Sequence, residues 1–261
     1  MTDEQMIRAR VSEHYGSAAR TLGDPGKEAS CCGPAASSSC CGSDGAQAKA
    51  VRSGLYTVEE LAVLPPQVGE ASWGSGDPVA YADLQPGEVV LDLGSGGGLD
   101  CLLAATKVGP AGHAIGVDMT PDMLALAWKN AAAAGAANVD FRKGVLEALP
   151  VASASVDVII SNCVINLSPN KAAVFAEALR VLRPGGRLAL SDIVLVGSLP
   201  EDARNDSRVW CDCVGGALQQ EDFLAGLEQA GFVDVHIVSA GSKAWAPGVA
   251  RSVLVRARKP V

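Results

Sequence analysis

The sequence predicts an α/β protein with a doubly wound, mostly parallel, Rossmann-like seven-stranded sheet. Strand-like and helix-like segments alternate over residues 89–192, a pattern typical of a parallel sheet with helices on both faces. The apolar run 89–93 leads directly into a glycine cluster and then into the helical pattern 99–105. Near the C-terminus, the strand-like runs 233–239 and 252–256 predict an antiparallel hairpin that closes the sheet.

Local composition sets the ends of the other elements. Thr57 and Glu60 have the spacing of a capping box, which predicts a short helix. Pro121 opens one helix and the run 183–186 ends another, because proline suits a first helical turn but cannot continue a helix. The remaining expected elements are strands at 113–118, 138–142, 156–161 and 187–192, and helices at 121–134, 171–182, 201–210 and 221–230.

A helical and loop extension precedes the predicted core. Residues 3–21 have apolar side chains at helical spacing and predict an amphipathic helix. Residues 22–54 are dominated by Gly, Ala, Ser and Pro, which bury too little apolar surface to offset the entropy of ordering, so we expect a mobile loop. We therefore expect an N-terminal helix and Cys-rich loop in 1–70, a Rossmann-like core in 71–195, and a small C-terminal α+β part in 196–261.

Composition excludes several classes of function. The net charge is −8, and basic residues are not clustered, which argues against a nucleic-acid partner because phosphate contacts require grouped Lys and Arg. No apolar stretch approaches the ~20 residues of a transmembrane helix, so no membrane partner is expected. The first residues lack the pattern of a secretory signal, which predicts a cytoplasmic protein with reduced thiols. The eight cysteines then call for an explanation other than structural disulfides.

A glycine-rich turn joins the first strand to the helix that follows it. The dinucleotide-binding fingerprint requires a third glycine where this chain has Leu99. The observed pattern is Asp-x-Gly-x-Gly-x-Gly over residues 92–98, which resembles motif I of class I S-adenosylmethionine (SAM) methyltransferases. The next strand ends in Asp118, and an acid there can accept hydrogen bonds from both ribose hydroxyls. The alternative is an ordinary strand-to-helix turn in which Asp118 caps a helix.

The expected SAM site lies at the carboxyl ends of the parallel strands. Glycines let a ligand approach the bare main chain, and a helix N-terminus offers free N–H groups. We expect Asp118 to bind the ribose and Gly94 and Gly96 to approach the methionine portion. Met119 and Leu146 are expected to flank the adenine. The full set of expected SAM-binding residues is Asp92, Gly94, Ser95, Gly96, Asp118, Met119, Leu146 and Asn162.

Paired cysteines mark the glycine-rich segment before the core. Cys31–Cys32 and Cys40–Cys41 are each followed by glycine. Adjacent thiols on such a backbone suit a soft, thiophilic element, and their spacing differs from the Cys-x2-Cys pattern of zinc fingers. The alternative is that they are inert cysteines in a linker.

Four further motifs are specific. They are Glu-His-Tyr-Gly at 13–16, Gly-Val-Asp-Met-Thr-Pro at 116–121, the segment 158–169 with its Asn-Cys-Val-Ile-Asn-Leu core, and Trp-Cys-Asp-Cys-Val-Gly-Gly-Ala at 210–217. Together they closely resemble arsenite SAM methyltransferases, over about residues 7–238. The resemblance implies a class I methyltransferase fold and methyl transfer from SAM to thiol-bound trivalent arsenic. It also implies a thiol reductant of the glutathione or thioredoxin type.

The resemblance assigns roles to particular cysteines. It implies that Cys163 and Cys213 are the catalytic arsenic ligands, and that an N-terminal ligand corresponds to Cys31 or Cys32. Ser75 stands where the family has a further cysteine, which is implicated with the N-terminal one in a redox-coupled disulfide step. The preferred arsenical and the number of methyl groups added therefore stay open, as does a compensating role for Cys40–Cys41.

The chemistry of arsenic agrees with a site that has cysteines but no obvious His or carboxylate pair. Trivalent arsenic is soft and keeps a lone pair, so transfer to it needs alignment and dehydration more than a general base. Cys101 lies on an apolar helix face and is expected to be a core residue, while Cys211 is either a spare ligand or a bystander.

Two other functions remain as alternatives. A carbon methyltransferase of the quinone or sterol type would share the fold, but it would need an apolar acceptor pocket or a base and has no use for paired thiols. The missing thiol at Ser75 keeps open a second alternative, a protein that binds arsenic or another soft metal without turnover. Methyl transfer to arsenic in a single turnover separates the enzyme from the binding protein.

Overall fold

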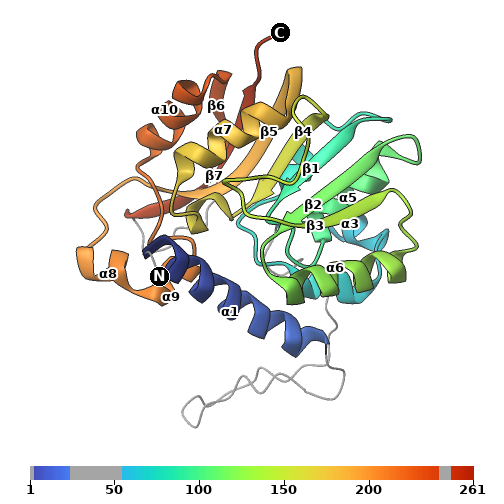
Figure 1. Ribbon diagram of the computed structural model, residues 1–261, viewed down its shortest axis with the longest axis horizontal. Coiled ribbons are helices and arrows are strands. Elements are labelled where there is room, and N and C mark those ends of the chain that lie inside the picture. The colour runs from blue at the N-terminus through green and yellow to red at the C-terminus, as the bar shows by residue number, and fades with distance from the viewer. Residues whose placement is uncertain (1–2, 24–54, 241–247) are drawn as a thin grey trace.

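The computed structural model describes residues 3–23, 55–240 and 248–261. At its centre lies a seven-stranded sheet in the order β3-β2-β1-β4-β5-β7-β6 (Figure 1). The strands are β1 (Val89–Leu93), β2 (His113–Asp118), β3 (Val139–Lys143), β4 (Val156–Asn162), β5 (Leu182–Leu195), β6 (Val233–Ala240) and β7 (Ala250–Arg258). The strands from β3 to β5 are parallel, and β7 runs antiparallel between β5 and β6. The predicted fold class is confirmed.

Helices cover both faces of the sheet, and the alternation of side chains along each strand fills two separate cores. On one face, Val90 packs with α3 (Val58–Ala62), α4 (Pro78–Tyr81), α5 (Leu99–Val108) and α6 (Pro121–Ala134). On the other face, Leu91 and Leu93 pack with α7 (Lys171–Val181) and α10 (Gln220–Ala230). None of the described helices combines the length and apolar character that crossing a membrane requires.

Further helices surround the carboxyl ends of the strands. Helix α1 (Asp3–Gly23) packs against α6 and also contacts α9 (Ser207–Cys211) (Figure 1). The 3-10 helices η1 (Pro66–Ala71) and η2 (Ile165–Leu167) precede α4 and α7, and α8 (Glu201–Asn205) precedes α9. This end of the sheet is where a doubly wound fold binds its ligands.

Two element boundaries predicted from the sequence are wrong. The fifth strand begins at Leu182 rather than at residue 187. The Pro-Gly-Gly run stays in the sheet because Gly185 N–H donates to Lys259 O, and Lys259 N–H donates to Gly186 O. The helix predicted at 201–210 is two helices, because Asp206 is extended and its side chain accepts a hydrogen bond from Arg208 N–H to cap α9.

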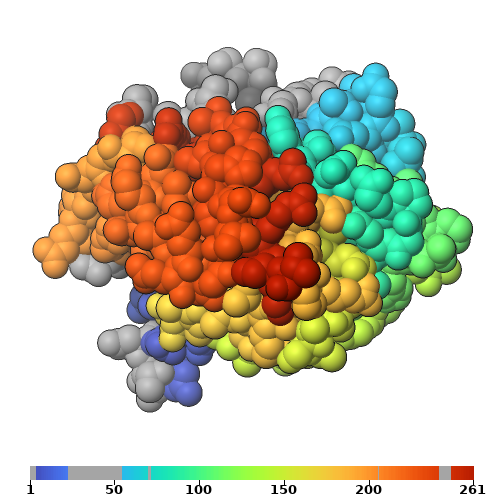
Figure 2. All heavy atoms as spheres, turned by 90° about the horizontal axis from the view of Figure 1, so that it is seen from above, coloured from blue at the N-terminus to red at the C-terminus, as the bar shows by residue number. Residues whose placement is uncertain are grey.

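The outer segments contribute directly to the central core. Tyr56, Leu61, Leu64 and Val68 lie in the same buried cluster as β1. The C-terminal strands β6 and β7 complete the sheet, and Figure 2 shows the orange C-terminal atoms lying directly against the yellow atoms of the middle segments. The division at residues 70 and 195 stays a prediction.

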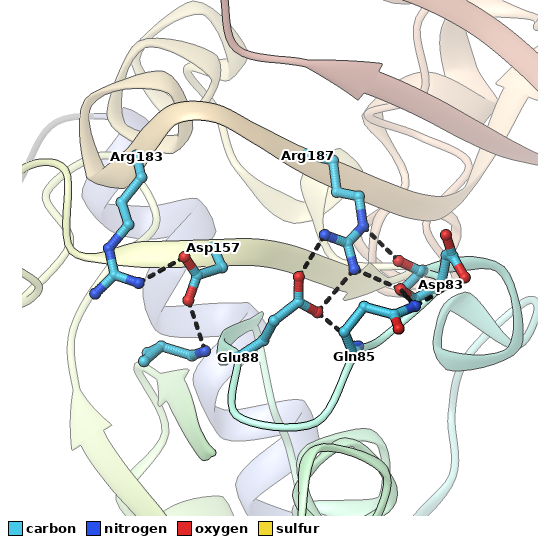
Figure 3. A network of polar contacts seen from close by, with 8 residues as sticks. Asp83, Gln85, Glu88, Asp157, Arg183 and Arg187 are labelled. Carbon is cyan, nitrogen blue, oxygen red and sulfur yellow. Dashed lines mark hydrogen bonds and ion pairs between the residues drawn. The ribbon is translucent and has the colours of Figure 1, made fainter. Parts of the chain in front are cut away.

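Ion pairs and hydrogen bonds join the three central strands at the end of the sheet opposite the ligand-binding edge (Figure 3). Arg187 on β5 donates to both carboxylate oxygens of Glu88, just before β1, at 2.7 and 2.8 Å. Asp157 on β4 accepts a hydrogen bond from Val89 N–H at 2.9 Å and pairs with Arg183. The three central strands are therefore held in register at their start, which keeps their opposite ends aligned around the site.

Candidate active site

A cleft of about 970 Å³, counted out to its mouth, opens at the carboxyl ends of β1, β2 and β4. The structure brings all eight predicted SAM-binding residues and Cys163 to the cleft wall. Other lining residues include Arg8, Tyr15, Tyr56, Trp73, Asp100, Glu147, Leu167 and Ser168.

The glycine turn after β1 forms the floor of this cleft. Gly94, Gly96 and Gly98 all have left-handed backbone conformations, with φ of 67°, 51° and 88°. An added Cβ would lie 2.3 Å from Val164 at position 94 and 2.9 Å from the Phe141 ring at position 98. At Gly96 it would meet no atom within 4 Å. Two glycines are therefore required by packing, while Gly96 leaves bare backbone beside open space.

Asp118, at the end of β2, lies next to this turn. Its carboxylate accepts hydrogen bonds from Gly96 N–H at 3.0 Å and from Thr120 N–H at 2.8 Å. Burial raises the pKa of Asp118, and these backbone bonds oppose that rise. The glycine turn after β1 and the loop after β2 thus both fix the orientation of this acid at the cleft.

Two buried polar atoms near the turn lack a partner among the described residues. They are Oδ2 of Asp92 and Oγ of Ser95. Both residues line the cleft. Burial, followed by the charges of Asp100 and Asp118, raises the pKa of Asp92 well above its usual value. Unpaired buried polar groups are rare in folded proteins, so this corner fits a polar, positively charged ligand group.

Asn162, at the end of β4, ties the turn at 74–76 to the cleft. Its Oδ1 accepts from Ser75 N–H at 2.9 Å and from Gly76 N–H at 3.2 Å, and its Nδ2 donates to Gly76 O at 2.7 Å. A Cβ at Gly74 would lie 2.2 Å from the Asn162 amide. The side chain of Ser75 points elsewhere, because its Oγ lies 3.2 Å from Oγ of Ser191 on β5.

Asp100, on the first turn of α5, is a functional candidate that sequence reasoning missed. Its carboxylate accepts from the Tyr56 hydroxyl at 2.8 Å and from Asn162 Nδ2 at 3.0 Å. Burial raises the pKa of Asp100 to about 6, against the effect of these two bonds. Tyr56 comes from a distant segment, so only the spacing of Asp100 from the glycine turn could have signalled it.

The two predicted arsenic ligands lie side by side. Cys163 follows β4 and Cys213 follows α9; they are 7% and 3% exposed. Sγ of Cys213 donates to the backbone oxygen of Cys163 at 2.8 Å. The two Sγ atoms and a carboxylate oxygen of Asp192 all lie within 4.8 Å of one another. The neighbouring Cys163 side chain, together with burial, raises the pKa of Cys213 well above its usual value, so Cys213 is a thiol at neutral pH.

Both cysteines have an unusual backbone. Their φ angles are 62° for Cys163 and 64° for Cys213. A left-handed conformation is costly for a residue with a side chain, and such strain collects at functional sites. The N–H of Cys163 is anchored by a 2.7 Å bond to Ser191 O. Neighbouring contacts thus hold both thiols in place.

Apolar side chains surround the thiol pair. Val11, Leu167 and Cys211 pack with it, and Met119, Tyr15 and Trp210 are among the partly buried residues around it. The Tyr15 hydroxyl donates to Cys211 O at 2.9 Å, which attaches α1 to this cluster. The thiols therefore face a largely dry environment.

Of the other cysteines that the structure describes, Cys211 belongs to this cluster and Cys101 does not. Cys101 is buried in the α5 core, as expected. Cys31, Cys32, Cys40 and Cys41 lie outside the described residues.

Helix α1 borders the cleft through an ion pair that the sequence does not reveal. Arg8 lies 3.1 Å from Oε1 of Glu147, and Ser168 Oγ donates to the same carboxylate oxygen at 2.6 Å. The three residues come from segments far apart in the chain, and all line the cleft. The helix is thereby fixed over one side of the ligand space.

Comparison with known proteins places the chain in a family. A family described as a methyltransferase domain matches residues 84–231. The arsenite methyltransferase of Halobacterium salinarum is 43% identical over 243 residues, which are 90% of this chain and 59% of that protein. The human arsenite methyltransferase is 39% identical over 160 residues, 58% of this chain and 43% of that protein. The chain thus spans about half of the length of these curated relatives.

A solved structure agrees with the sequence comparisons. The crystal structure of an arsenic(III) S-adenosylmethionine methyltransferase from Chlamydomonas reinhardtii superposes with a TM-score of 0.68 at 37% identity. The match covers 78% of this chain and 72% of that one. The fold and the glycine-lined cleft therefore define a class I SAM methyltransferase. Within that class, the chain belongs to the arsenite methyltransferase family.

Proposed function

We propose that this protein transfers methyl groups from SAM to trivalent arsenic, either arsenite or an organoarsenical, bound by Cys163 and Cys213. One observation carries the proposal: Cys163 lines the cleft that holds the glycine turn, and the buried Cys213 lies directly beside it. The relatives named as arsenite methyltransferases support this substrate. A methyltransferase that acts on a carbon acceptor would not need a pair of thiols.

The cleft offers a partner to each part of SAM. We assign the ribose hydroxyls to Asp118, which lies beside Gly96, and the open backbone at Gly96 supports the methionine portion beside Gly94. Met119 and Leu146 line the same cleft as apolar neighbours for the adenine. Ser95 and Asn162 also line the cleft, and the Ser95 hydroxyl has no partner among the described residues.

The charge of the cleft suits a cationic methyl donor. Bound SAM supplies an electrophilic methyl group on a positively charged sulfonium. Asp92, Asp100 and Asp118 lie close enough to raise the pKa of Asp92, and a cation would relieve their mutual repulsion. The unpaired Oδ2 of Asp92 would then gain a partner.

The thiols can bind an oxygen-ligated arsenical without a general base. When two thiols replace two hydroxyl ligands of arsenite, two As–S bonds form, and the thiol protons leave with the hydroxyls as two water molecules. The protonated state of Cys213 fits this exchange. The apolar cluster around the pair then excludes water, and the fixed backbones limit how far the arsenic can move.

We further propose a thiol reductant, of the glutathione or thioredoxin type, as a partner. A methyl cation added to the arsenic lone pair formally oxidises arsenic to the pentavalent state, so another cycle requires two electrons. We assign the third arsenic ligand to Cys31 or Cys32 on the family resemblance. Cys101, Cys163, Cys211 and Cys213 are free thiols, which fits a reducing compartment such as the cytoplasm.

A single-turnover experiment tests the proposal. The protein, in molar excess over a trivalent arsenical, is mixed with SAM and a small thiol, and arsenic species and S-adenosylhomocysteine are quantified. We expect both methylated arsenic and S-adenosylhomocysteine. Tight arsenic binding without either product would instead indicate a soft-metal-binding protein.

A further inference from the structure

Asn166 is a buried polar residue for which the proposed chemistry has no direct use. It lies in η2, three positions after Cys163, and is fully buried. Its Nδ2 donates to Asp192 Oδ1 at 2.8 Å, to Ile193 O at 2.6 Å and to Cys213 O at 3.0 Å. One amide nitrogen therefore joins η2, β5 and the segment that carries the second thiol.

The same short stretch of β5 anchors both cysteines. Cys163 N–H donates directly to Ser191 O at 2.7 Å. Cys213 is connected to the next two residues, Asp192 and Ile193, through the Asn166 amide. The separation of the two thiols therefore depends on Asn166 as well as on the hydrogen bond from Cys213 Sγ to Cys163 O.

Asn166 also supports a backbone that would relax without it. Cys213 has a positive φ, and such a conformation persists only where surrounding contacts impose it. Close packing adds to this constraint, because a Cβ at Gly216 would lie 2.1 Å from Asn166 O. Oδ1 of Asn166 has no partner among the described residues. The side chain therefore holds the Cys213 backbone through the hydrogen bonds that its Nδ2 donates.

We propose that Asn166 is a positioning residue that holds Cys213 beside Cys163 and thereby sets the affinity of the thiol pair for arsenic. The proposal rests on the proposed function, because it takes the two cysteines as the arsenic ligands. The effect is specific to the arsenical, since Asn166 is not among the residues that line the cleft. Loss of the amide releases Cys213 O and lets the segment after α9 shift.

Asn138 offers a matched control for general loss of stability. Its Nδ2 donates to Ala105 O at 3.0 Å, Gly109 O at 2.9 Å and Gly112 O at 3.5 Å. It therefore also bridges several backbone oxygens, but between α5 and β3, away from the thiols. Asn138→Ala should weaken the fold without changing the thiol pair.

The test compares Asn166→Ala, Asn138→Ala and the unaltered protein. Phenylarsine oxide is the probe, because an arsenical with a single carbon substituent takes two thiols. Its dissociation constant is measured by competition with a small dithiol, and the SAM dissociation constant by calorimetry. A thiol misplaced by ~1 Å makes a much weaker interaction with its ligand. We therefore expect Asn166→Ala to weaken arsenical binding about ten-fold or more. SAM affinity should stay within about two-fold of that of the unaltered protein.

The measurements distinguish failure of the positioning role of Asn166 from failure of the proposed function. Asn166→Ala with unchanged arsenical affinity, or an equal loss in Asn138→Ala, overturns the positioning role. Failure of the unaltered protein to bind the probe through Cys163 and Cys213 overturns the proposed function instead. If Asn166→Ala does not bind SAM and is therefore misfolded, Asn166→Ser keeps one donor and should show a smaller loss of the same kind.

Discussion

Cys213 donates a hydrogen bond to the backbone oxygen of Cys163 at 2.8 Å, although 50 residues separate them in the chain. Both residues are in the left-handed region, and both are buried. The thiol pair is thus assembled within the fold itself, which lowers the ordering cost of binding a ligand that needs two sulfur atoms.

The first prediction concerns these two thiols. Cys163→Ser and Cys213→Ser should each abolish arsenic methylation, because oxygen is a poorer ligand than sulfur for a soft acceptor. SAM binding should persist in both variants, since neither change alters the glycine turn. Methylated arsenic and SAM affinity are measured on the same preparations.

Cys101→Ser is the control for this pair. Cys101 is fully buried on α5, in a core cluster separate from the thiols. The variant should lose some stability on thermal unfolding while its methylation rate stays close to that of the unaltered protein. If Cys101→Ser lost methylation while Cys163→Ser and Cys213→Ser kept it, Cys163 and Cys213 would not be the catalytic thiols.

The second prediction concerns the ribose site. Asp118→Ala should weaken SAM binding roughly ten- to a hundred-fold, because a charge-assisted hydrogen bond contributes about 1.5–3 kcal/mol. Asp140→Ala is a matched control, since Asp140 pairs with Arg142 on β3 and does not line the cleft. Calorimetry that shows the same SAM affinity for Asp118→Ala and the unaltered protein would exclude this role.

The third prediction concerns pH. The pKa of Asp100 is raised to about 6, so the carboxylate is ionised above that pH and takes up a proton below it. A cationic ligand favours the ionised form, and SAM affinity should therefore fall as the pH drops from about 7.5 to about 5. A ligand that lowers this pKa by about one unit weakens binding about five-fold over that interval, and about ten-fold only well below both pKa values.

Asp100→Asn separates this titration from that of other groups. The variant should bind SAM more weakly at neutral pH and show a smaller change between the two pH values. Equal pH dependence in the variant and the unaltered protein would show that another group, such as Asp92, is responsible.

The fourth prediction concerns the packing behind Cys213. Gly216→Ala places a Cβ against Asn166 O, and overpacking of this kind costs about 1–3 kcal/mol. We expect a lower unfolding temperature and weaker arsenical binding. Gly135→Ala is the comparison, because Gly135 has a positive φ but open space around its Cβ position. It should lose stability and keep its arsenical affinity.

Features that depend on neighbouring residues could be predicted from the sequence. The glycine turn over 92–98, the acid Asp118 at the end of β2 and Cys163 after β4 all follow from a strand ending at the carboxyl edge of a parallel sheet. The capping box at Thr57 and Glu60 is local as well, and the structure confirms it.

Features that depend on distant partners could not be predicted. Asn166 and Asp192 are 26 residues apart, and Tyr15 and Cys211 are 196 residues apart. Nothing in the composition around Cys163 or Cys213 signals a left-handed backbone, because cysteine is not a residue that favours it. Pairing with the C-terminal residues, rather than local propensity, keeps Gly185 in the sheet.

Methyl transfer to thiol-bound arsenic is tested by the fate of arsenic in the Cys163→Ser variant. Trivalent arsenite, methylarsenite and phenylarsine oxide are each incubated with SAM, a small thiol and either the variant or the unaltered protein, and the arsenic species are separated and quantified. We expect methylated product from at least one arsenical with the unaltered protein and none with the variant. Near-normal methylation of every arsenical by Cys163→Ser would contradict this expectation.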